Sequence, residues 1–75
     1  MGAIQDKAAL RALGRRLRVA RQGRKLTQES LAERARLRRR YIIRIEMGEG
    51  NPTFLTLRNL AKALRVPVRE LTDPD

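Results

Sequence analysis

The chain has 75 residues and contains neither cysteine nor histidine, so disulfide bonds and the usual zinc sites are excluded. Eighteen Lys and Arg against eight Asp and Glu give a net charge of +10. This balance favours a polyanionic partner, nucleic acid before an anionic membrane; an arginine-rich coding bias is the alternative explanation for the high ratio of Arg to Lys. No apolar run is long enough for a membrane span or for the core of a signal peptide.

Two helices are predicted in the first half of the chain. The first covers about 7–22, with Asp6 as its N-cap and Gly23 placed to end it in the left-handed conformation. Its apolar residues form one stripe at helical spacing: Leu10, Leu13, Leu17 and Ala20. The second helix covers about 27–35 and begins at Thr27, whose hydroxyl is a typical N-cap.

A third helix is predicted over about 39–47, with Ile42 and Ile45 facing inward and Gly48 at its end. Only a three-residue connection separates it from the second helix. Two short helices joined in this way cross steeply, as in a helix-turn-helix. At the crossing, Ala32 is small enough for the two helices to touch.

The last predicted elements are a helix over about 53–65, with Thr53 as N-cap, and a short turn of helix over 68–72. The apolar stripe of the longer helix is predicted to include five residues: Phe54, Leu57, Leu60, Ala61 and Leu64. We therefore predict an all-α, five-helix domain over 7–72, an N-terminal arm at 1–6 and a C-terminal tail at 73–75.

The outward face of the third helix combines arginines with two apolar side chains: Arg39, Arg40, Ile43, Arg44 and Met47. Six arginines lie within residues 34–44, and their mutual repulsion is costly without an anionic partner. Arginine donates two hydrogen bonds to guanine O6 and N7, and an aliphatic side chain contacts the thymine methyl group. This face therefore favours the reading of duplex DNA over a merely solvated surface.

Several short motifs follow one another along the chain: LGRRLR at 13–18, LTQESLA at 26–32, RYIIRIEMG at 40–48, NPT at 51–53 and LAKAL at 60–64. In this order and spacing they resemble the lambda-repressor-like helix-turn-helix family of the Cro/CI (XRE) type. The resemblance extends from Leu13 to Leu71, and the stretch 39–52 is most similar to the small controller proteins of restriction–modification systems.

The resemblance implies roles for individual residues. The base-reading positions are Arg39, Arg40, Ile43 and Arg44, and the phosphate-contacting positions are Gln28, Arg38, Tyr41 and Asn51. Tyr41 fits partial packing equally well, and Asn51 fits a turn residue before Pro52 equally well. The resemblance also implies a partly buried ion pair between Arg21 and Glu46, which ties the first helix to the end of the third.

The chain departs from the family pattern at a few positions. Arg36 occupies a turn position usually held by glycine, so the turn either takes a left-handed conformation at a cost of about 1 kcal/mol or is built differently. Arg38 stands where an N-cap Ser or Thr is common. Ile43 and Leu55 are apolar where the family is usually polar, which makes Ile43 a candidate for DNA contact and Leu55 a candidate for an interface.

The family's operators are palindromes bound by dimers. Since 75 residues leave no room for a separate dimerisation domain, we expect a homodimer that uses this domain's own surface. The candidate interface residues are Leu55, Val66 and Val68, with Val66 as a core residue in the alternative interpretation.

The predicted function is a sequence-specific regulator of transcription that binds double-stranded DNA, prokaryotic or phage in origin, cytoplasmic and associated with the nucleoid. Neither enzymatic activity nor a cofactor, metal, membrane or small-molecule ligand is expected. Two alternatives stay open: an antitoxin-type regulator whose main partner is a toxin protein, and a non-specific coat on nucleic acid, which would show steep salt dependence without sequence preference.

Overall fold

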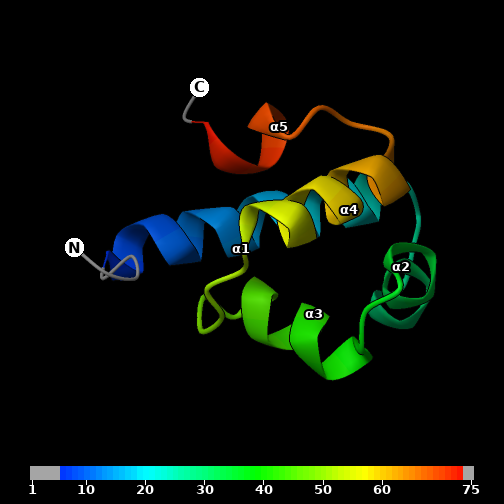
Figure 1. The fold of residues 1–75 in the computed structure, drawn as a ribbon, viewed down its shortest axis with the longest axis horizontal. Helices are drawn as coiled ribbons and strands as arrows, with labels where there is room; N and C mark the ends of the chain where they lie inside the picture. The colour runs from blue at the N-terminus through cyan, green and yellow to red at the C-terminus, as the bar shows by residue number, and fades with distance from the viewer. Residues whose placement is uncertain (1–5, 74–75) are drawn as a thin grey trace.

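The structure, a computed structural model, describes residues 6–73, and within them it contains five helices and no strand (Figure 1). The helices are α1 (Lys7–Gly23), α2 (Gln28–Ala35), α3 (Arg39–Glu46), α4 (Phe54–Leu64) and α5 (Arg69–Thr72). The all-α, five-helix prediction is confirmed. Apart from Asp6 and Asp73, the predicted arm and tail lie outside the described residues. Over 6–73, no helix has both the length and the apolar character needed to cross a bilayer.

Three helices begin at the N-caps that the sequence indicates, Asp6, Thr27 and Thr53. Each cap side chain accepts hydrogen bonds from backbone N–H groups of the first turn, at distances of 2.9–3.2 Å. These bonds satisfy donors that have no partner within the helix. The N-cap of α3 is Arg38, which makes no such side-chain bond.

Four helices end in the same backbone motif. The residue after the last turn takes a left-handed conformation, and the N–H of the following residue bonds back to a carbonyl of that turn. Leu26 donates in this way to the Arg21 carbonyl at 3.1 Å, and Leu37 donates to the Ala32 carbonyl at 2.8 Å. The left-handed residues are Lys25, Arg36 and Arg65, with φ of 57°, 58° and 59°, and Gly48, with φ of 78°.

The predicted C-cap role of Gly23 is wrong, because Gly23 is still helical and Lys25 is the left-handed residue. The physical reason is the position of Leu26, which must follow the left-handed residue in order to pack against the core. Arg36 adopts the left-handed conformation, which was one of the two possibilities for that turn.

The core is a single cluster to which all five helices contribute: Leu13, Leu17, Leu31, Ala32, Ala35, Ile42, Ile45, Leu60, Ala61, Leu64 and Leu71. The main helix contacts form a closed ring, in which α1 packs on α3, α3 on α2, α2 on α4, α4 on α5 and α5 on α1. Each helix therefore buries its apolar stripe against two neighbours. In Figure 1, α3 and α5 lie on opposite sides of the molecule.

The predicted place of Phe54 in the apolar stripe of α4 is wrong, since this side chain is 64% exposed. Burial rises along the stripe, from Phe54 through half-buried Leu57 to fully buried Leu60. The spacing places the three residues on one face, but only the later turns of α4 are covered by neighbouring elements.

Gly14 marks the closest approach of α1 to α3. A Cβ atom at this position would lie 2.5 Å from the carbonyl oxygen of Ile45 and 2.7 Å from that of Glu46. Both distances are shorter than any normal contact, and both neighbours are backbone atoms that cannot move aside cheaply. Gly23, in contrast, has helical backbone, and a Cβ there would meet nothing within 4 Å.

We expect the two glycines to respond in opposite directions to alanine. Gly14→Ala should lower the free energy of unfolding by about 1–3 kcal/mol, because the added methyl group separates α1 from α3. Gly23→Ala should raise it by about 0.4–1 kcal/mol, because alanine restricts the unfolded chain and fits the helix without strain. Urea denaturation followed by circular dichroism measures both changes. Effects of the same sign would contradict this description of the α1–α3 contact.

Candidate nucleic-acid interface

The pair α2–α3 forms a helix-turn-helix whose inner faces are fully packed. Leu31 and Ala32 of α2 and Ile42 of α3 are buried, with 0–3% of their surface exposed. The turn between the helices is held by the left-handed Arg36 and by the packing of Leu37 against the core. The orientation of α3 is thus fixed from its inner side, and its outer side is free for a partner.

The outer side of α3 carries the arginines that the sequence assigns to base reading. Arg39, Arg40 and Arg44 are exposed, and Ile43 between them is half-buried. Arg39 lies 3.6 Å from Glu29, while Arg40 and Arg44 form no ion pair within the described residues. Met47 follows at 58% exposure. The face therefore offers two uncompensated guanidinium groups next to apolar surface.

The residues assigned to phosphate contact surround this face in different states. Arg38 and Asn51 are exposed, as a contact with phosphate requires. Tyr41 is half-buried and packs against the core, so it fills at least the structural role. Gln28 is half-buried at the first turn of α2, where free backbone N–H groups favour an anion.

The side chain of Gln28 has a partner inside the protein. Its amide Nε2 donates to Oε1 of Glu46 at 3.1 Å. An amide nitrogen carries two N–H groups, so one remains for an outside acceptor. The internal bond fixes the direction of the remaining N–H group, and the two roles of Gln28 are compatible.

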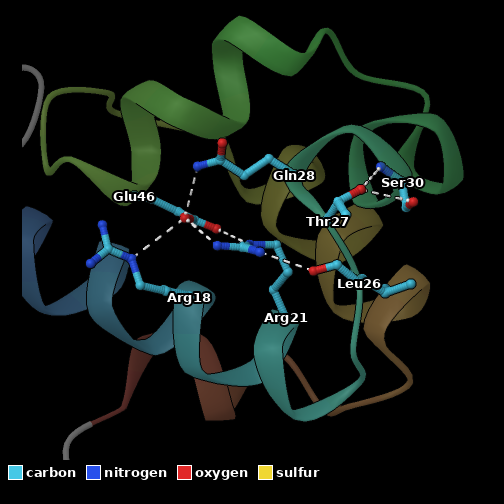
Figure 2. A network of polar contacts seen from close by, with 7 residues as sticks. All are labelled: Arg18, Arg21, Leu26, Thr27, Gln28, Ser30 and Glu46. Atoms are coloured by element: carbon cyan, nitrogen blue, oxygen red, sulfur yellow. Dashed lines mark hydrogen bonds and ion pairs between the residues drawn. The ribbon is translucent and has the colours of Figure 1, made fainter.

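Glu46 is the centre of a buried polar network, which Figure 2 shows from close by. Arg21 of α1 donates through Nε to Oε2 at 2.6 Å and through Nη2 to Oε1 at 3.1 Å. A third guanidinium N–H, on Nη1, bonds the carbonyl of Leu26 at 2.9 Å. Arg18 adds a longer ion pair, with Nε at 3.6 Å from Oε1.

The Glu46 carboxylate needs these partners because its side chain is only 1% exposed. A buried charge without a partner is costly, and a negative charge at the last turn of a helix is unfavourable as well. The paired geometry of Arg21 compensates for both effects. The structure thus brings Arg21 and Glu46 together, and it adds Gln28 and Arg18, which the sequence did not connect to this pair.

Arg24 has a structural role that sequence analysis missed. Its Nε donates to the carbonyl of Leu64 at 2.8 Å, and its Nη2 donates to the carbonyl of Arg65 at 3.1 Å. Arg24 therefore satisfies carbonyl groups at the end of α4 that have no partner within the helix. Because the two segments lie forty residues apart, no local pattern could have indicated the contact.

The helix-turn-helix family matches this chain over residues 17–71. The chain belongs to the helix-turn-helix family of the Cro/CI (XRE) type. This is a family of DNA-binding transcriptional regulators. The resemblance seen in the sequence motifs is thereby confirmed.

Two protein relatives of this helix-turn-helix chain have descriptions. The immunity repressor protein of Bacillus phage phi105 is 45% identical over 56 residues, which are 75% of this chain and 39% of the repressor. An uncharacterized HTH-type transcriptional regulator of Sinorhizobium fredii is 43% identical over 49 residues, which are 65% of this chain and 64% of that protein. The chain thus spans less than two thirds of the length of either relative.

Solved structures show the same helix-turn-helix fold. A restriction-modification controller protein from Aeromonas hydrophila matches with a TM-score of 0.83 and 39% identity, over 85% of this chain and 97% of the controller. A hypothetical transcription factor from Neisseria matches with a TM-score of 0.83 and 29% identity, over 99% of this chain and 86% of that one.

The network around Glu46 predicts a large effect on stability. Glu46→Ala leaves the largely buried Arg21 without its counter-charge, and removing one partner of a well-buried pair costs about 3–5 kcal/mol. We expect the melting temperature to fall by at least about 8 °C, since about 1 kcal/mol corresponds to about 4–8 °C in a domain of this size. Differential scanning calorimetry measures the shift.

Glu33→Ala is the matched control, because it changes the net charge equally at an exposed position of α2. Its effect should stay within about 0.5 kcal/mol. Similar small shifts in both variants would show that the buried pair contributes little.

Proposed function

We propose that this protein is a sequence-specific regulator of transcription that binds a palindromic operator in double-stranded DNA as a homodimer. The observation that carries the proposal is the pair of exposed, uncompensated arginines on the outer face of α3, Arg40 and Arg44. A solvated surface gains nothing from such repulsion, whereas guanine edges offer each guanidinium two acceptors. The base-reading set is Arg39, Arg40, Ile43 and Arg44, and the phosphate-contacting set is Gln28, Arg38, Tyr41 and Asn51.

The relatives support the regulatory part of this proposal. One is described as an immunity repressor and another as a restriction-modification controller protein. The controller covers 85% of this chain and is itself covered over 97% of its length. Of the regulators among the relatives, the controller type is therefore the one that we propose for this chain.

The homodimer is proposed to form around the start of α4. Leu55 and its neighbour Phe54 are each 64% exposed, which is unusual for large apolar side chains placed side by side. Val66 and Val68, the other interface candidates, are half-buried and pack against the core. We therefore assign the larger part of the interface to Leu55 and Phe54, and a smaller part to the exposed edges of the two valines.

Selection of bound sites from random duplex DNA, at about 150 mM salt to suppress non-specific binding, should recover a palindrome. Its half-sites should lie about one helical turn apart. Arg44→Ala should then lower the ratio of operator affinity to random-DNA affinity by the value of one guanine contact, about 1–3 kcal/mol. Fluorescence anisotropy with both duplexes measures the ratio.

Two variants control for effects that carry no sequence information. Arg69→Ala removes one positive charge from α5, on the side of the molecule away from α3 (Figure 1), and should leave the ratio unchanged. Gln28→Ala should weaken both duplexes by the same factor, because a phosphate contact is common to all sequences. Equal losses of specific and random affinity in every α3 arginine variant would instead support a non-specific coat.

The dimer is tested by sedimentation. The chain should show a concentration-dependent equilibrium between monomer and dimer, and Leu55→Glu should shift it toward the monomer by placing a charge in an apolar contact. Glu49→Gln, at an exposed position outside the proposed interface, should leave the equilibrium unchanged. A monomer at all accessible concentrations would remove this interface from the proposal.

A further inference from the structure

Within the helix-turn-helix, Glu29 is an acidic side chain placed against a base-reading candidate. Its Oε1 lies 3.6 Å from Nη1 of Arg39, which joins the first turn of α2 to the first turn of α3. The two side chains remain 68% and 61% exposed. An ion pair with this exposure contributes about 0–1 kcal/mol to folding. Stability therefore gives little reason for a carboxylate at this position.

Glu29 and Arg39 line a depression of about 410 Å³ between the beginnings of α2 and α3. The other lining residues are Thr27, Gln28, Ser30 and Glu33. Gln28 is the residue that we assign to a phosphate of the DNA backbone. A phosphate that approached Arg39 in this depression would thus come close to the Glu29 carboxylate.

The carboxylate acts differently on the two kinds of DNA acceptor that Arg39 could bind. Two like charges about 4 Å apart repel by about 1 kcal/mol even in the dielectric of water. A phosphate next to Arg39 therefore meets the charge of Glu29, whereas guanine O6 and N7 carry no formal charge. Glu29 also holds one side of the guanidinium and leaves its other donors for a base edge.

We propose that Glu29 is a specificity residue: it makes phosphate an unfavourable partner for Arg39 and leaves guanine as the favoured one. The inference rests on the proposed function, because it requires that Arg39 faces base edges. It assigns to Glu29 a contribution to selectivity and not to affinity. Its removal should therefore strengthen the binding of random DNA.

Glu29→Gln removes the charge and preserves the size of the side chain. We expect the affinity for random duplex DNA to rise about fivefold, the factor that corresponds to about 1 kcal/mol at 25 °C. The affinity for the selected operator should rise by a smaller factor, so that the ratio of the two affinities falls. Anisotropy titrations at one fixed salt concentration measure both affinities.

Glu33→Gln is the matched control. It makes the same change in net charge and lines the same depression, but Glu33 forms no ion pair within the described residues. It should change the two affinities by the same factor. In an Arg39→Ala background, Glu29→Gln should also leave the ratio unchanged, because the arginine that it restrains is absent.

The outcomes separate this inference from the proposed function. If the unmodified chain selects no preferred sequence, sequence-specific regulation fails and the role of Glu29 fails with it. If an operator is recovered and Glu29→Gln acts on the ratio no more than Glu33→Gln, the role of Glu29 is overturned and the proposed function stands. A fall in the ratio that persists in the Arg39→Ala background would overturn it as well.

Discussion

The structure depends on one buried carboxylate, that of Glu46, at the point where three helices meet. It lies at the end of α3, accepts two hydrogen bonds from Arg21 of α1 and a third from Gln28 of α2, and has Arg18 nearby (Figure 2). The same crossing is where Gly14 lets the backbone of α1 touch the last carbonyl groups of α3. Close contact and charge pairing support each other here, because the carboxylate can be compensated only if α1 comes this near.

The network separates two kinds of positive charge in a chain that carries a net +10. Arg21 and Arg24 spend their donors on a carboxylate and on carbonyl groups inside the protein. Arg40 and Arg44 have no internal counter-charge and project from the outer face of α3. The first kind fixes the position of the helix-turn-helix, and the second kind is what the proposed function uses. Through Gln28, the buried network also reaches the surface at the first turn of α2.

Acidic residues in this chain have correspondingly distinct places. Asp6 caps α1, Glu46 is compensated in the interior, and Glu29 faces a base-reading candidate at the surface. A surface of arginines alone would bind any polyanion, because attraction to phosphate does not depend on sequence. A regulator has to prefer one site among many, and a carboxylate next to a cation raises that preference by weakening the binding of the competitors. In the proposed function, the net charge provides attraction and Glu29 restrains it.

The sequence by itself determined the five helices, most of their boundaries and the outward face of α3, because these follow from local physics. Apolar spacing predicts each helix, and Asp6, Thr27 and Thr53 cap the chain within three residues of themselves. The family motifs added the pairing of Arg21 with Glu46. The errors occurred where a distant neighbour decides. Gly23 yielded the left-handed position to Lys25 because Leu26 packs on the core, and Phe54 is exposed because nothing covers the first turn of α4. The partners of Arg24, Gln28 and Glu29 were likewise decided only by the tertiary structure, since each contact joins segments that sequence periodicity treats as independent.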